Sequence, residues 1–167
     1  GISGNTFDPA LATAGNVEII YTYTDGNSCA NSDTIHTIVY AQPNALIVTQ
    51  IQNDYCENGA NVALMGYPNG GTFTGDGIST GSFIPQLANL GTNEIVYTYT
   101  DAFGCSNADT TNTVVHALPT VNIGSLADIC ENASNTVLSG ATPSGGSYSG
   151  LGINSLTNTI YPSILSP

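Results

Sequence analysis

The chain has 167 residues with no Lys and no Arg, and its twelve Asp and Glu residues give it a formal charge of −12. Without cations it cannot displace counterions from a polyanion, which excludes binding to nucleic acid or an anionic membrane through a basic patch. No apolar run approaches the ~18 residues of a membrane span. The 41% hydrophobic content, with Val, Ile and Tyr in strand-like runs, is nevertheless that of a folded chain.

Short strands separated by Gly, Pro and Asn are predicted along the chain. Pro9–Gly15 and its recurrence Pro85–Gly91 are the only helical hints; proline opens each and glycine closes it, which predicts a single turn that crosses between two sheets. Further strands are predicted over Ala45–Ile51, Asn61–Met65, Gly71–Thr74, Ser82–Ile84, Glu94–Thr100 and Thr110–His116. Six or seven short strands in one unit fit an antiparallel Greek-key sandwich.

Strict alternation identifies the side of the longest strand that faces the core. In Glu94–Thr100, Ile and Tyr alternate with Val and Thr, a period of two that is typical of a half-buried strand. We therefore predict that one row of side chains is buried in each copy of this strand. The row consists of Ile19, Tyr21, Tyr23, Ile95, Tyr97 and Tyr99.

Internal repetition determines the predicted architecture. Tyr21–Pro43 matches Tyr97–Pro119 at 13 of 23 positions with an offset of 76, and Gly1–Pro9 matches Gly77–Pro85 at the same offset. Cys56–Gly75 recurs as Cys130–Gly150 after a one-residue adjustment. Such a period indicates a tandem array. The prediction is an all-β protein of immunoglobulin-like antiparallel β-sandwich repeats of about 76 residues.

Three segments follow from this repeat. Residues 1–43 are the C-terminal part of one repeat, 44–119 a complete repeat, and 120–167 the N-terminal part of the next. Each partial repeat would leave an apolar sheet face and edge strands unpaired. Completion is expected from a longer polypeptide, which we favour, or from a neighbouring copy by strand addition, and both give a head-to-tail array. The two terminal pieces overlap only around Gly152–Pro162.

The repeat carries the pattern C-x-N … V-x-L-x-G-x-P-x-G-G-x-[FY]-x-G-x-G-I … F-x-P … Y-T-Y-T-D-x-x-G-C. Its residues are Cys56, Asn58, Val62, Leu64, Gly66, Gly70–Thr74, Gly77, Ile78, Phe83, Pro85, Tyr97–Asp101 and Cys105. This pattern resembles the Ig-like and PKD-like repeats of giant Bacteroidota surface proteins. The resemblance implies export by a dedicated secretion system and a role in adhesins, filaments or stalks, and it implies no particular ligand.

The four cysteines occur twice per repeat. Cys29 and Cys105 follow the Tyr-Thr-Tyr-Thr-Asp strand, and Cys56 and Cys130 precede the Val-x-Leu strand. In a secreted setting this spacing indicates disulfides. A bridge between Cys56 and Cys105 within one repeat is the simple pairing, although an Ig-like sandwich places those two loops at opposite ends. A bridge between neighbouring repeats and free thiols stay open as alternatives.

Ten of the twelve acids recur between repeats, which gives them two interpretations. An Asp that ends a strand commonly caps the following turn with its own side chain. The alternative is a Ca²⁺ ion at a junction between repeats, although the spacing matches no EF-hand. The candidate ligands are Asp25, Asp101, Asp54, Glu57, Asp128 and Glu131. No other cofactor is expected.

Catalysis has no candidate residues. His36 and His116 fall at unrelated positions of the repeat, opposite Asn112 and Tyr40 respectively. The glycine run Gly70–Gly77 has no accompanying Lys for a phosphate loop and indicates hairpins and close packing. The chain is therefore not expected to be an enzyme.

Two threonines are candidates for modification. Thr34 and Thr110 follow an Asp at the same place in consecutive repeats. The local sequence resembles the Asp-Thr/Ser acceptor motif of the O-glycosylation system of the same group of bacteria. A turn-ending Asp followed by a strand Thr is the other interpretation.

The function expected from these observations is mechanical. The chain would be a structural repeat segment of a secreted, extracellular or cell-surface filament or adhesin, contacting neighbouring repeats or copies of itself. The alternative is a module that binds a glycan or protein through exposed loops such as Tyr67–Gly71 or Ala102–Ser106. Aromatic side chains clustered in one exposed loop would favour binding, whereas the same residues packed at a junction would favour a spacer.

Overall fold

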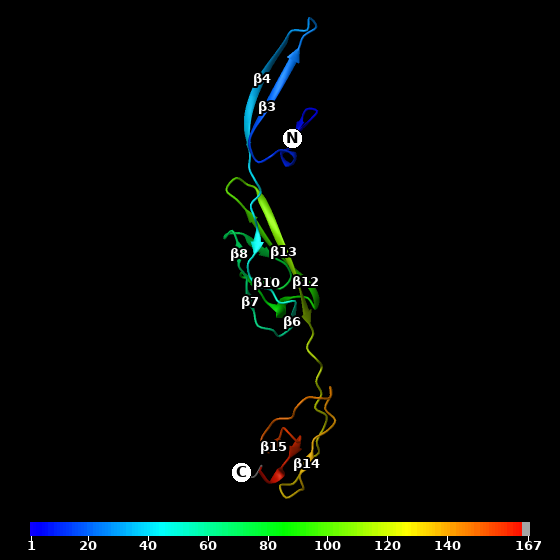
Figure 1. Ribbon diagram of the computed structural model, residues 1–167. Helices are drawn as coiled ribbons and strands as arrows, with labels where there is room; N and C mark the ends of the chain where they lie inside the picture. The colour runs from blue at the N-terminus through cyan, green and yellow to red at the C-terminus, as the bar shows by residue number, and fades with distance from the viewer. Residues whose placement is uncertain (165–167) are drawn as a thin grey trace. The chain divides into compact units, whose positions relative to one another are not determined.

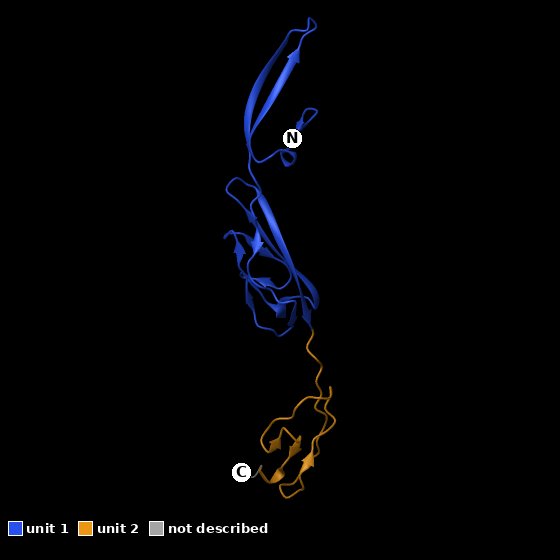
Figure 2. Ribbon diagram, viewed as in Figure 1, with its two compact units in different colours: residues 1–116 blue, residues 117–167 orange. Residues whose placement is uncertain are grey.

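The computed structural model describes residues 1–164 and confirms the all-β prediction. Short strands form several sheets, and three short 3-10 turns are the only helical elements in the described residues. The chain divides into two compact units, unit 1 (Gly1–His116) and unit 2 (Ala117–Pro167) (Figure 2). Within the described residues no helix is long and apolar enough to cross a membrane.

The complete sandwich lies in the second part of unit 1 (Figure 1). Its elements are β5 (Leu46–Ile47), β6 (Asp54–Cys56), β7 (Val62–Ala63), β8 (Gly66–Tyr67), β9 (Thr72–Thr74), β10 (Ile78–Ser79), β11 (Ser82–Phe83), η2 (Pro85–Leu87), β12 (Gly91–Thr100) and β13 (Ser106–His116). One sheet has the order β6-β13-β12-β9, and smaller sheets are formed by β10-β11-β7 and by β5-β8. β6 pairs with β13 in parallel, whereas the other pairs are antiparallel.

The core of this sandwich is small and lies between the four-stranded sheet and the three-stranded sheet. Its buried members are Leu64, Phe83, Ile95 and Val115, and Tyr97 is buried against Phe73, which packs on this cluster. The predicted alternation is confirmed for β12, where Ile95 and Tyr97 are buried and Tyr99 is half-buried. The turn η2 lies between β11 of one sheet and β12 of the other, so the predicted crossing between sheets is also found.

The first part of unit 1 repeats the second half of the sandwich. Its elements are β1 (Ile2–Ser3), β2 (Thr6–Phe7), η1 (Pro9–Leu11), β3 (Gly15–Thr24) and β4 (Ala30–Val39). The register of β3–β4, which begins with Gly15 opposite Val39, is that of β12–β13, which begins with Gly91 opposite Val115. β1–β2 likewise reproduces the pairing of β10–β11.

Unit 2 repeats the first half of the sandwich. Its elements are β14 (Thr136–Val137), β15 (Ile153–Asn154), β16 (Thr159–Ile160) and η3 (Pro162–Ile164). Thr136 and Ile153 pair with Ile160 in β14-β16-β15, as Val62 and Ile78 pair with Phe83 in β7-β11-β10. The described residues of unit 2 contain no counterpart of the long β12–β13 hairpin.

Candidate assembly site

The site begins with Tyr97, whose side chain is 2% exposed at the centre of the complete sandwich. Its hydroxyl donates to the carbonyl of Pro68 and accepts a hydrogen bond of 2.9 Å from the backbone N–H of Gly71. A Cβ at Gly71 would lie 2.4 Å from the Tyr97 ring and 2.5 Å from the carbonyl oxygen of Thr98. A Cβ at Gly66 would also lie 2.4 Å from the ring. The absence of side chains at these two glycines therefore makes room for the Tyr97 ring.

A third glycine, Gly75, allows the backbone of β12 to approach closely at Glu94. A Cβ at Gly75 would lie 2.2 Å from the carbonyl oxygen of Glu94 in β12, and Gly75 itself has a φ of 140°. The interpretation of the glycine run as close-packing residues thus agrees with the structure. We define Gly66, Gly71 and Gly75 as the tyrosine cradle.

Unit 2 retains all three glycines of the cradle, as Gly140, Gly146 and Gly150. A Cβ at Gly140 or Gly146 would meet no atom within 4 Å, and one at Gly150 would meet only the side chain of Ile153. Gly140 and Gly150 have φ values of 91° and 153°, which favour glycine within unit 2 itself, so only Gly146 has no such use there. In the complete sandwich the same positions accommodate β12.

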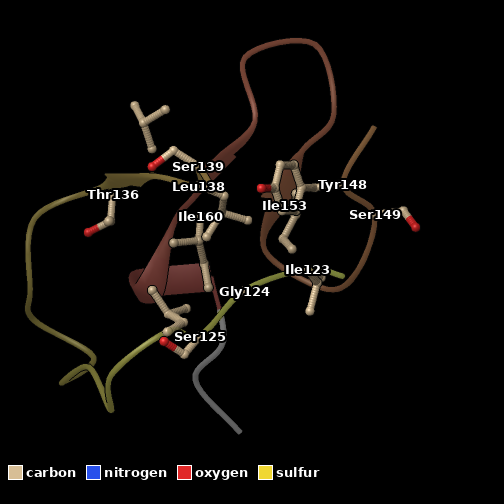
Figure 3. Close-up of a pocket in the computed structure, with 12 residues that line it drawn as sticks. Ile123, Gly124, Ser125, Thr136, Leu138, Ser139, Tyr148, Ser149, Ile153 and Ile160 are labelled. Carbon is tan, nitrogen blue, oxygen red and sulfur yellow. The ribbon is translucent and has the colours of Figure 1, made fainter. Parts of the chain in front are cut away.

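An apolar groove of about 400 Å³ lies beside this second cradle. Figure 3 shows Leu138, Tyr148, Ile153 and Ile160 among the side chains that line it. By alignment and register, these residues correspond to the core or core-packing residues Leu64, Phe73, Ile78 and Phe83 of the complete sandwich. There the core is closed by Ile95 and Val115 of the β12–β13 hairpin.

The β3–β4 hairpin presents the opposite half of such a core. Tyr21, which occupies the position of Tyr97, is 70% exposed, and Tyr23 and Ile35 are 62% and 60% exposed. The predicted burial of this row is therefore wrong for β3, and only Ile19 is half-buried. The physical reason is that the sheet that would cover the row is reduced here to β1–β2, whose Ile2 and Phe7 line a shallow hollow with Ile19 and Tyr21.

A junction connects this hairpin to the complete sandwich. Tyr40, directly after β4, stacks on Phe103 at the tip of the β12–β13 hairpin, with ring centroids 4.0 Å apart and planes at 9°. The side chain of Asn107 donates to the carbonyl of Pro43 at 3.0 Å, and Asp109 accepts from the N–H of Ile47 at 2.7 Å. The linker between the repeats is thus held against the hairpin tip.

The aspartates that end β3 and β12 cap their turns. Asp25 accepts from the N–H groups of Asn27 and Cys29, both at 2.9 Å, and Asp101 accepts from those of Phe103 and Cys105 at the same distance. These hydrogen bonds agree with the interpretation that Asp25 and Asp101 cap the turns. The identical geometry explains why an Asp recurs at the end of both strands, but it does not explain the Cys, whose backbone N–H could come from almost any residue.

The six candidate calcium ligands are not brought together. Within residues 1–164 no three His, Cys, Asp or Glu side chains form a group that could hold a metal ion. Asp54 instead lies 2.7 Å from Nε2 of His116, where both side chains are more than half exposed. For Glu57, Asp128 and Glu131 the structure shows no shared site.

The cysteines are unpaired in the described residues, and the register excludes one pairing. Cys56 lies opposite His116, the last residue of β13, whereas Cys105 precedes the first. At ~3.3 Å per residue the strand separates them by roughly 35 Å, and a disulfide requires Cα atoms within about 7 Å. The predicted bridge within one repeat is therefore wrong. Cys29 and Cys130 have no bridge either, and pairing between neighbouring repeats stays a prediction.

Thr34 and Thr110 are exposed on β4 and β13. Their backbone N–H groups donate to the preceding aspartates at 2.9 and 3.0 Å. The local geometry is the same in both copies, so a modifying enzyme that accepts one threonine would find the other equally accessible. Glycosylation stays a prediction.

Comparison with known proteins gives no family. No protein-family model matches the chain, and no curated protein matches it. The evidence for the site is therefore its geometry alone, and the sequence predicted only part of that geometry. The recurring glycines were identified, but their partner Tyr97 was predicted only as a core residue; the available signal was the joint recurrence of the glycines and the Tyr-Thr-Tyr-Thr strand.

Proposed function

We propose that this chain is a structural repeat segment of an extracellular filament or long cell-surface adhesin, in which the sandwiches act as a stalk or fibre scaffold. The observation that carries the proposal is the Tyr40–Phe103 junction. An aromatic residue at an exposed hairpin tip is here used to hold the linker from the preceding repeat, a contact that serves extension of an array.

Two further features support the same function. Partial copies of the same strand pattern precede and follow the complete one in the sequence, and such recurrence is typical of an array of like units. The absence of Lys and Arg leaves trypsin-like proteases no cleavage site, which suits a protein exposed outside the cell.

A binding module is the less favoured function. Of the two loops considered for binding, Ala102–Ser106 contributes Phe103 to the junction. The other, Tyr67–Gly71, is held by Tyr97 through the carbonyl of Pro68 and the N–H of Gly71. Both loops thus have a structural use.

Immunogold electron microscopy on unpermeabilised cells of the source organism tests the proposal, with an antibody raised against this chain. We expect label on filaments or stalks at the cell surface. Label confined to the cell interior would contradict the proposal. A glycan array probed with the same chain tests the binding function, for which we expect no specific signal.

A further inference from the structure

We propose that the complete sandwich contains a clamp that resists tension. The clamp consists of the entering segment, residues 43–57, and of β13, the strand by which the chain leaves the sandwich. It keeps the sandwich folded when the chain is pulled through both of its ends. This role deepens the proposed function and rests on it, because a stalk or filament is the setting in which such a pull arises.

The direction of the paired strands determines how a pull acts on them. β6 and β13 are parallel, with Asp54 opposite Val114 and Cys56 opposite His116, and the N–H of Glu57 donates to the carbonyl of His116 at 2.9 Å. Tension draws β6 toward its N-terminal end and β13 toward its C-terminal end. Because parallel strands are joined by evenly spaced hydrogen bonds, these opposite pulls load all of the bonds together. An antiparallel hairpin pulled at its two ends would open one bond at a time.

Side chains of β13 hold the first half of the entering segment. The side chain of Asn107 donates to the carbonyl of Pro43 at 3.0 Å. Two residues further along β13, the carboxylate of Asp109 accepts a hydrogen bond of 2.7 Å from the N–H of Ile47. A pull on the chain before the sandwich is therefore passed to β13 before it reaches β6.

A buried hydroxyl and the backbone hold the second half of the entering segment. Thr113 is 1% exposed, and its hydroxyl donates to the carbonyl of Gln52 at 2.8 Å. The N–H of Val114 donates to the carbonyl of Asn53, also at 2.8 Å. Tyr55 of β6 packs against the core cluster, so sliding of β6 would also withdraw an aromatic side chain from the core. The entering segment is thus held to β13 from one end of that strand to the other.

The side chains that make the clamp recur in the preceding copy. Asn107, Asp109 and Thr113 of β13 correspond to Asn31, Asp33 and Thr37 of β4, which has the same register. In a chain under tension the weakest repeat unfolds first, so a clamp is useful only if successive repeats contain it. The recurrence of all three residues agrees with this requirement.

Two conservative variants separate the clamp from ordinary stability. Thr113→Val removes the hydroxyl that joins β13 to the carbonyl of Gln52, and it keeps a β-branched side chain. Tyr97→Phe is the matched control, because its hydroxyl belongs to an equally buried residue and joins β12 to the N–H of Gly71. Neither β12 nor Gly71 lies in the strands by which the chain enters or leaves the sandwich. In urea both variants should lose stability to a comparable extent, since each loses the hydrogen bonds of one hydroxyl.

Force-clamp spectroscopy of the full chain, held by tags at its two ends, measures the lifetime of the sandwich under constant tension. The wild type should unfold in one step that lengthens the chain by roughly 20–25 nm, the extension of the residues between Pro43 and Ala117. Thr113→Val should shorten this lifetime about fivefold, because the lost hydrogen bond must break before the strands slide. Tyr97→Phe should shorten it by less than about twofold, because its contacts persist until β13 has moved.

The direction of the pull gives a second test, which needs no destabilising variant. Asn58 and Ala117 are exposed and lie just beyond the same end of the two parallel strands. Attachment through azide-bearing residues at these two positions should peel β6 from β13 one bond at a time. The sandwich should then unfold at a lower force than when it is pulled through the chain ends.

Three results would overturn the proposal. They are a wild type that lengthens without a single step, a lifetime of Thr113→Val that falls no more than that of Tyr97→Phe, and equal unfolding forces in the two directions. None of them would alter immunogold labelling, since surface filaments can contain repeats that unfold easily. Circular dichroism of each variant before pulling verifies that the fold is retained, and the comparison of directions decides the matter if Thr113→Val does not fold.

Discussion

Tyr97 and Tyr21 occupy equivalent positions in two copies of the repeat. Replacing each in turn compares the loss of unfolding free energy at a buried tyrosine with the loss at an exposed one. Tyr97→Ala removes a buried aromatic side chain, which costs about 3–5 kcal/mol of unfolding free energy. The N–H of Gly71 and the carbonyl of Pro68, both in partly buried residues, also lose their partner, and a hydrogen bond typically contributes about 0.5–1.5 kcal/mol. Tyr21→Ala at high dilution should cost less than about 0.5 kcal/mol, because that side chain is mostly exposed.

Urea unfolding followed by circular dichroism measures both losses, and hydrogen exchange of β12 assigns the transition to the complete sandwich. Since a domain of this size has only about 5–15 kcal/mol of stability, Tyr97→Ala should bring the sandwich close to unfolding. Equal losses for the two variants, or a loss below about 1 kcal/mol for Tyr97→Ala, would refute the assignment of this face to the core.

The remaining predictions concern the cradle, one turn, the charge and the thiols. Gly71→Ala should destabilise the complete sandwich by at least about 2 kcal/mol through overpacking, whereas Gly146→Ala should leave thermal unfolding of dilute protein unchanged. Ser28→Gly should slow hydrogen exchange of β3–β4 by an amount equivalent to about 0.5–1 kcal/mol, because Ser28 has a φ of 67° where the second hairpin has a glycine. Melting temperature should rise with salt, because only like charges are screened, and Ca²⁺ and Na⁺ should give equal gains at equal ionic strength; an excess gain with Ca²⁺ would restore the calcium interpretation. Thiol titration after mild treatment with a disulfide oxidant should show no bridge between Cys56 and Cys105, and a mapped bridge would contradict the register of β13.

Sequence periodicity predicted the elements that have a strong local signal. The alternation around Ile95 and Tyr97 was sufficient to predict β12 and its buried side. The proline that opens η2 and the glycine that follows it were sufficient to predict that turn. Each signal lies within a few residues. The short strands β6, β8 and β10 were not predicted, whereas β5, β7, β9 and β11, which are equally short, lie within stretches that the sequence did predict as strands. Two or three residues carry no periodicity, so the pattern does not separate these cases. Their pairing is set by the neighbouring strands, which a local pattern does not contain.

The same limit explains the errors at the candidate site. Tyr21 has the same local sequence as Tyr97, so the pattern predicted burial for both, whereas burial depends on the facing sheet. Cys56 and Cys105 recur together in each repeat, yet they lie at opposite ends of β13 because β6 pairs with its final residues. The recurrence of a residue identifies equivalent positions in successive repeats, and it does not show that two recurring residues lie close together in space.

Hydrogen exchange of the dilute protein tests most directly the claim that the second part of unit 1 is the complete sandwich. The amides of β9 and β12 should be protected, because these strands pair with each other and β12 also pairs with β13. The matching residues 147–149 of unit 2, which belong to no strand, should exchange fast. Equal protection of β9 and residues 147–149 would contradict the claim.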